Sequence, residues 1–151
     1  MTPNPNFTPA FVVTQPPAEV FRAITNPRAW WSEAIAGGTE KQGDEFSYRY
    51  RDMHRCRIRL VEVVPDSRVV WQVLDNHFSF TEDETEWQDT RIVFEVSKRD
   101  GETELRFTHV GLTPGIECYG NCSGAWGFYV NESLRGLIAS GKGQPATVAE
   151  G

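Results

Sequence analysis

Residues 118–145 read CYGNCSGAWGFYVNESLRGLIASGKGQP, and their spacing is the strongest indication of the architecture of the chain. The apolar and small residues of this stretch recur every three or four positions, as on one face of a helix: Trp126, Tyr129, Val130, Ser133, Leu134, Leu137 and Ile138. Asn131, Glu132 and Arg135 take the other side, and Gly141 with Pro145 beyond it provides a stop. The pattern predicts one long C-terminal helix with a single buried face.

Between residues 44 and 111 the pattern changes to alternation, which is typical of strands. The apolar positions fall on one side of each strand: Phe46, Tyr48 and Tyr50, then Cys56, Ile58 and Leu60, then Ile92, Phe94 and Val96, then Leu105, Phe107 and His109. The strand around Trp71 is apolar on both faces, and Pro65–Ser67 and Asp100–Gly101 are turn signals. We expect an antiparallel sheet with one wet face and one covered face. On the wet face, Arg49, Arg51, Arg57 and Arg59 should pair with acidic neighbours such as Glu95 and Glu104.

The N-terminal part predicts a short strand in residues 8–15 and two short helices in residues 16–27 and 27–38. Trp30 and Trp31 are consecutive, so on a helix they would splay apart. One should pack under the rim of the sheet, and the other should lie at a cavity mouth or a dimer contact. The element order gives an α+β fold in which only the last helix is broad enough to cover the dry face of the sheet.

Length and charge narrow the class of protein. The chain of 151 residues suits a single domain over 1–151, with residues 1–6 and 144–151 as flexible tails. The net charge of −6 and the lack of a basic stripe argue against nucleic acid as a partner. No apolar run reaches the roughly 20 residues of a membrane span, and no secretory signal is visible. Three cysteines, an odd count, favour a reducing environment, so we expect a cytoplasmic protein that is a monomer or a homodimer.

Two residue types, cysteine and histidine, could bind a metal or take part in catalysis. Cys118 and Cys122 could form a metal or redox pair, but a second ligand pair is missing, and Cys122 lies one turn before Trp126 on the buried face. We therefore expect packing cysteines, with no metal and no cofactor. His109 falls on the covered face, where it is either a core histidine with a hydrogen-bond partner, a polar anchor for a ligand, or a general base. No nucleophile with an orienting acid stands beside it in the sequence, and we assign no catalytic residue.

Many rings should converge between sheet and helix, and they either fill a core or line a ligand cavity. The candidate ligand-binding residues are Trp31, Tyr48, Tyr50, Ile58, Trp71, Phe94, Phe107, His109, Cys122, Trp126, Tyr129 and Val130. Residues 75–89 read as a solvated acidic loop without a calcium-binding pattern, in which Phe78 and Phe80 could form a lid.

Four segments, in this order and spacing, resemble the START-like (SRPBCC) superfamily and, within it, the activators of heat-shock-protein ATPase. They are PPAEVFRAITNPRAWW (16–31), VEVVPDSRVVWQV (61–73), TELRFTHVGL (103–112) and CSGAWGFYVNESLRGLIASGKGQP (122–145). The resemblance implies a helix-grip fold, a curved sheet around a C-terminal helix with a cavity between them. Relatives use that cavity for lipids, sterols, polyketides or plant hormones. The chaperone activators proper carry an additional N-terminal domain, for which this chain has no room.

Three functions follow as hypotheses. The first is non-catalytic binding of a small hydrophobic or amphipathic ligand in the cavity. The second is a protein-interaction module acting as a chaperone co-factor, as the resemblance implies. The third is a cyclase-like or dehydratase-like enzyme that uses His109 as its base.

Overall fold

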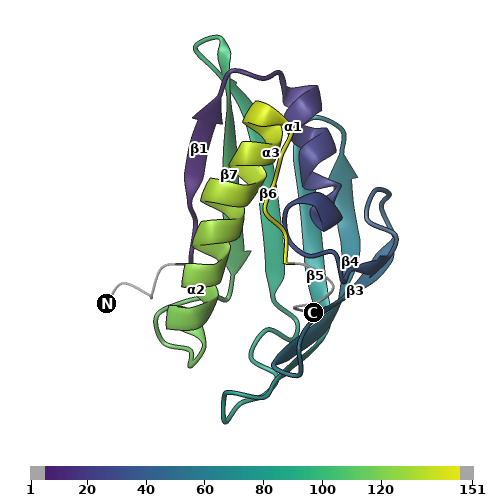
Figure 1. Cartoon of the computed structure of the whole chain (residues 1–151), viewed down its shortest axis with the longest axis vertical. Helices are drawn as coiled ribbons and strands as arrows, with labels where there is room; N and C mark the ends of the chain where they lie inside the picture. Colours follow the sequence, from purple (N-terminus) through teal and green to yellow (C-terminus); the bar gives the residue numbers. More distant parts are fainter. Residues whose placement is uncertain (1–5, 147–151) are drawn as a thin grey trace.

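The computed structural model describes residues 6–146 and contains one seven-stranded antiparallel sheet in the order β1-β7-β6-β5-β4-β3-β2. The strands are β1 (Ala10–Val13), β2 (Ala36–Gly37), β3 (Glu45–Tyr50), β4 (His54–Val64), β5 (Arg68–Phe78), β6 (Arg91–Arg99) and β7 (Glu102–Val110). The helical segments are α1 (Pro17–Ile24), η1 (Pro27–Ala29), α2 (Tyr119–Phe128), η2 (Tyr129–Leu134) and α3 (Arg135–Ser140). The last three run on without a break and lie across one face of the sheet, with α1 beside α3 (Figure 1).

The curvature of the sheet has a local cause in β4. Its pairing with β5 shifts register between Arg57 and Ile58 and again between Leu60 and Glu62. Such bulges bend a strand and increase its twist, which lets the sheet wrap around a helix. Asp100 and Gly101 both have positive φ in the β6–β7 hairpin, as a two-residue turn of this kind requires. The predicted helix-grip fold is confirmed.

The gripped helix buries one face, as its spacing predicted. Trp126, Val130, Ser133, Leu134 and Ile138 are buried. The helix contains one feature that the sequence did not predict, the π-helical turn η2 in its middle. It ends where Gly141 adopts a left-handed conformation with φ of 80°.

The second predicted helix is wrong, because only the three-residue 3₁₀ turn η1 forms there. Trp30 follows that turn with a non-helical backbone, so the two tryptophans do not splay apart. Both are buried, and their rings stack with centroids 6.5 Å apart. Both also stack on Trp71 of β5, at 6.2 and 5.9 Å, so neither lies at the surface.

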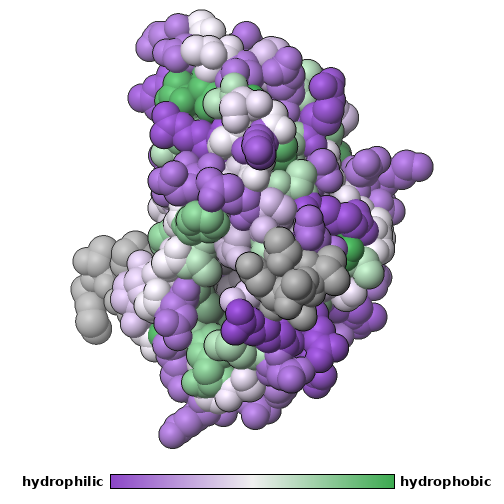
Figure 2. Space-filling model, viewed as in Figure 1, coloured by the Kyte–Doolittle hydropathy of each residue, from purple (hydrophilic) through white to green (hydrophobic). Residues whose placement is uncertain are grey.

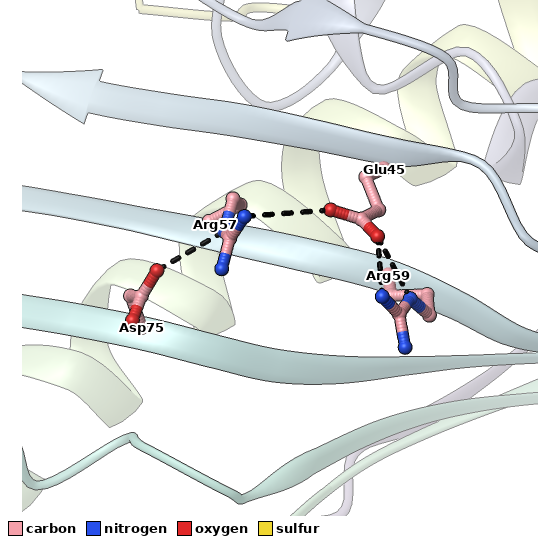
Figure 3. A network of polar contacts seen from close by, with 4 residues as sticks. All are labelled: Glu45, Arg57, Arg59 and Asp75. Atoms are coloured by element: carbon pink, nitrogen blue, oxygen red, sulfur yellow. Dashed lines mark hydrogen bonds and ion pairs between the residues drawn. The ribbon is translucent and has the colours of Figure 1, made fainter.

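Three of the four expected arginines lie on the wet face of the sheet but with other partners, whereas Arg51 lies in the turn after β3 with its guanidinium over the Tyr50 ring. Arg57 bridges Glu45 and Asp75, and Arg59 also binds Glu45 (Figure 3). Arg49 pairs with Asp52 in the β3–β4 turn. The acidic residues expected opposite them bind other arginines, Glu95 contacting Arg68 and Glu104 contacting Arg99. The difference arises because β3 and β4 are neighbours in the sheet, whereas Glu95 and Glu104 lie on β6 and β7.

Residues 144–146, which were expected to belong to a flexible tail, form hydrogen bonds with the domain. The backbone N–H of Ala146 donates to the carbonyl of Trp31, and the carbonyl of Ala146 accepts from Glu33. The N–H of Gln144 donates to the hydroxyl of Ser133. Residues 144–146 are therefore held against the domain, while the remaining tail positions, 1–5 and 147–151, lie outside the described residues. Within residues 6–146 no helix has the length and apolar character to cross a membrane.

Candidate functional site

One pocket of about 320 Å³ opens between the N-terminal half of the gripped helix and the end of the sheet formed by β3, β4 and β5. Its wall is mostly aromatic: Trp31, Tyr48, Tyr50, Met53, His54, Phe78, Phe80, Trp87, Asn121, Cys122, Ala125, Trp126, Phe128 and Tyr129. None of these side chains is an acid, a lysine or an arginine. A volume of this size falls within the range of about 300–1,000 Å³ that holds small ligands.

Half of the predicted ligand-binding residues lie in this wall: Trp31, Tyr48, Tyr50, Cys122, Trp126 and Tyr129. The others lie outside it, fully buried in the core: Ile58, Trp71, Phe94, Phe107, His109 and Val130. The reason is packing, since Trp71 stacks on Trp30 and Trp31 and makes edge contacts with Phe46 and Phe94. These rings fill most of the space between sheet and helix, and the pocket remains at one end of it.

His109 is a structural residue with both ring nitrogens engaged. The indole N–H of Trp126 donates to its Nδ1 over 3.1 Å, so the proton must be on Nε2. Nε2 then donates over 2.8 Å to the hydroxyl of Thr90, which in turn donates to the carbonyl of Trp87. Burial lowers the pKa of His109 to about 3, so the ring is neutral at pH 7. With no lone pair left over, His109 cannot act as the general base of the third hypothesis.

His54 is the histidine in the pocket wall, and it was not among the residues predicted to bind a ligand. It begins β4 and lies between Tyr48 and Trp87, at ring-centroid distances of 5.1 and 4.6 Å. Its Nε2 lies 2.8 Å from Oδ1 of Asn76 on β5. Burial lowers its pKa to about 4, so this ring is also neutral at pH 7. The alternation of β4 places His54 on the same side as Cys56 and Ile58, which is the signal that could have found it.

The segment from residue 75 to residue 89 differs from the predicted loop. Strand β5 continues to Phe78, so Phe78 is a buried wall residue rather than part of a lid. Phe80 does lie in the loop and is exposed at the pocket. Trp87, which the sequence analysis passed over among the acidic residues, is buried and stacks on Trp126 at 5.7 Å with its ring nearly parallel.

The side chains of Glu86 and Glu117 connect this loop to the start of α2 through four hydrogen bonds, which we call the clasp. Glu86 accepts the backbone N–H groups of Glu117 and Cys118, at 2.6 and 2.9 Å. Glu117 in return accepts those of Glu82 and Asp83, at 3.0 and 2.9 Å. Hydrogen bonds to ionised groups are stronger than neutral ones. The clasp thus fixes the loop that carries Phe80 and Trp87 against the helix that carries Cys122 and Trp126.

Cys118 and Cys122 are both buried free thiols, as is Cys56. Two causes raise the pKa of Cys122: chiefly the hydrogen bond with the neighbouring thiol of Cys118, and secondly burial. A thiol that stays protonated is a poor nucleophile and a poor metal ligand. Within residues 6–146, no three His, Cys, Asp or Glu side chains gather as a metal site would require. The pair contributes packing at the side of the pocket.

The fold has relatives among solved structures. The solution structure of the Aha1 dimer from Colwellia psychrerythraea is 21% identical with a TM-score of 0.73, and the alignment covers 92% of this chain and 99% of that one. DynU16, from the dynemicin biosynthetic locus, is 19% identical with a TM-score of 0.63, covering 90% of this chain and 48% of its own. CalU16 from Micromonospora echinospora is 16% identical with a TM-score of 0.61, covering 88% and 74%. At these identities the likeness concerns the fold alone.

A comparison with curated protein sequences finds no match. The family model described as Activator of Hsp90 ATPase homolog 1-like protein matches residues 14–139, from the end of β1 to the end of the gripped helix. This range contains the pocket wall and all of the sheet except β1. The chain therefore belongs to the family of Activator of Hsp90 ATPase homolog 1-like proteins.

Proposed function

We propose that this protein binds a small apolar or amphipathic molecule in the pocket beside Trp126 and does not transform it. The observation that carries the proposal is the wall itself, in which aromatic rings surround a few uncharged polar groups. Ligand sites in proteins have this make-up. Membership of the family and a fold shared with DynU16, a protein from a biosynthetic locus, are compatible with it.

The polar groups in and behind the wall are poorly suited to chemistry on a ligand. His54 keeps an unpaired ring nitrogen, but burial lowers its pKa to about 4, which makes it a weak base. His109 has both nitrogens bonded within the core, and the thiol of Cys122 is kept protonated by Cys118 and by burial. Burial likewise raises the pKa of Tyr48. These groups favour holding a ligand over acid–base or nucleophilic catalysis.

A pocket-filling substitution tests the proposal. Ala125 is exposed and lines the pocket, so Ala125→Phe should fill it without disturbing the core. Asn131→Phe is the matched control, because Asn131 is exposed on the same helix and lies outside the pocket wall. Titration with Nile red, an uncharged dye that fluoresces in apolar sites, should saturate for the wild type and for Asn131→Phe.

Ala125→Phe should bind the dye at least about tenfold more weakly, since the space for it is lost. Equal affinity of all three proteins would place the dye elsewhere and would count against the proposal.

A second candidate function, a protein-interaction module that acts as a chaperone co-factor, is favoured by the mouth of the pocket. Met53, Phe80 and Phe128 are among the exposed large hydrophobic residues, and all three lie at this one pocket. The face shown in Figure 2 is mainly hydrophilic, with small separate apolar patches. Replacing all three by Ser should abolish stimulation of an Hsp90-type ATPase if this function holds. Under ligand binding alone, no stimulation occurs with any variant.

We also propose that the protein is cytoplasmic and forms a homodimer. The three free cysteines support a cytoplasmic protein. The related Aha1 structure is a dimer, which supports a homodimer over a monomer for this chain. Sedimentation velocity at micromolar concentration checks the assembly.

A further inference from the structure

We propose that the pocket selects an uncharged aromatic molecule whose hydroxyl or N–H group donates a hydrogen bond to Nδ1 of His54. The inference rests on the ligand-binding function proposed above and adds the chemical class of the ligand. It follows from the tautomer of His54, from the charge of the wall and from the rings that compose the wall.

The tautomer of His54 is fixed by Asn76. Nδ2 of Asn76 donates to the carbonyl of Glu84 at 3.4 Å, which orients Oδ1 toward Nε2 of His54 at 2.8 Å. An amide oxygen only accepts hydrogen bonds, so Nε2 must carry the proton, and Nδ1 of the neutral ring keeps a lone pair. Within residues 6–146, Nδ1 forms no hydrogen bond, while the ring lies in the pocket wall. A donor on the ligand would satisfy it.

A second wall group also lacks a strong partner. The indole N–H of the buried Trp87 finds no hydrogen-bond partner in the described part of the chain, although the Cys122 thiol, a weak acceptor, interacts with it. The rings of Trp87 and His54 are perpendicular, with centroids 4.6 Å apart. The Trp87 nitrogen is itself buried, so it is His54, and not Trp87, that offers a ligand in the pocket a hydrogen bond.

The wall discriminates against charge. No acid, lysine or arginine lines it, and Arg51 lies over the Tyr50 ring without being part of the wall. A carboxylate or an ammonium group would lose its water inside the pocket without gaining a partner of opposite charge. Stacked and edge-on rings such as Trp31 with Tyr48, at 4.1 Å, and Trp87 with Trp126 favour a flat aromatic body.

Three matched probes test the inference at pH 7 by competition with Nile red. They share a naphthalene body: 2-naphthol donates a hydrogen bond, 2-methoxynaphthalene only accepts one, and 2-naphthoate is an anion. The wild type should bind 2-naphthol roughly two- to tenfold more tightly than 2-methoxynaphthalene, the range expected of one net hydrogen bond. It should bind 2-naphthoate most weakly.

Two variants separate His54 from the other polar groups. His54→Phe keeps a ring in the wall and removes the acceptor, so the preference for 2-naphthol over 2-methoxynaphthalene should vanish. His77→Phe makes the same change at a histidine of β5 that lies outside the pocket wall, and it should keep the preference. Because the readout is a ratio of two affinities, a general loosening of the pocket does not mimic the result.

The outcomes distinguish this inference from the function on which it rests. Equal affinities of the wild type for 2-naphthol and 2-methoxynaphthalene, or tighter binding of 2-naphthoate, overturn the ligand class and leave ligand binding intact. This comparison holds even if His54→Phe does not fold. A preference that persists in His54→Phe overturns the role of His54. Failure of Nile red and of all three probes to bind overturns both proposals.

Discussion

His54 and His109 flank the same residue, Trp87, at ring-centroid distances of 4.6 and 4.7 Å, yet they have different roles. His109 has a partner on each nitrogen and joins β7 to the gripped helix and to the loop before β6. His54 has one partner, Asn76, and turns the rest of its ring to the pocket. His109 thus serves packing, whereas the unpaired Nδ1 of His54 is what the proposed binding function assigns to the ligand.

Both histidines make the stability of the protein depend on pH. Burial lowers the pKa of His54 to about 4 and that of His109 to about 3, whereas an unfolded histidine has a pKa of about 6.5. Between pH 6.5 and 4 the unfolded chain therefore binds more protons than the folded one, and the free energy of unfolding falls as the pH is lowered. Each histidine contributes up to about 1.4 kcal/mol per pH unit.

Urea unfolding of the wild type at pH 7, 6 and 5 measures this slope. His54→Phe should lose about half of it. A midpoint that stays constant between pH 6.5 and 5 would show that the histidines are not buried as neutral rings.

The sequence predicted His109 better than it predicted the pocket. Alternation along β7 sufficed to place His109 on the covered face, and its burial is confirmed. Alternation cannot tell a residue that fills the core from one that borders a cavity, which is why Trp71 and Phe94 were selected together with Tyr48. That distinction depends on how rings from distant elements pack, as Trp30 on Trp71 shows.

Among the elements, the contact between the loop at 79–90 and the start of α2 shapes the pocket most directly. Glu86 and Glu117 accept four backbone N–H groups between them. Glu86→Ala should leave two of these groups at the helix start without acceptors and cost about 0.5–2 kcal/mol, as the loss of a helix cap does.

Hydrogen exchange should report the loosened clasp. In Glu86→Ala we expect faster exchange in residues 79–90 and at the start of α2, together with weaker Nile red binding. Glu84→Ala is the control with the same change in charge, because the exposed Glu84 side chain contacts His77 and takes no part in the clasp. Equal exchange in the two variants would mean that the clasp does not hold the loop.

The elements that rest on local pattern were predictable, and those set by tertiary contacts were not. The sheet and the gripped helix follow from periodicities of two and 3.6 residues. The π turn η2 has no such signal, and its Ser133 accepts the N–H of Gln144 while donating to the carbonyl of Trp30. Residues 27–38 lack a helix because Trp30 and Trp31 gain more by stacking on Trp71.

At the scale of the whole molecule, the closing segment, residues 141–146 after the gripped helix, packs back against the N-terminal part of the domain. It crosses back to Trp31 and Glu33 through the backbone of Ala146. Gly143 lies so close to the carbonyl of Ala29 that a Cβ there would overlap with it. Gly143→Ala should therefore cost about 1–3 kcal/mol, as other overpacked sites do.

The control for this substitution is Gly124→Ala on α2. A Cβ at Gly124 meets no atom within 4 Å, so the change should stabilise the helix by about 0.5–1 kcal/mol. Urea unfolding measures both variants. If Gly143→Ala is as stable as the wild type, the closing segment does not pack as described.

The central claim is that the aromatic pocket beside Trp126 holds a small molecule. Native mass spectrometry of the protein, purified without denaturation and incubated with a panel of uncharged aromatic compounds, tests it most directly. We predict one bound molecule per chain for the wild type and none for Ala125→Phe, with organic extraction identifying any compound carried from the cell. Unliganded masses for the wild type throughout, or the same adduct on both proteins, would contradict the claim.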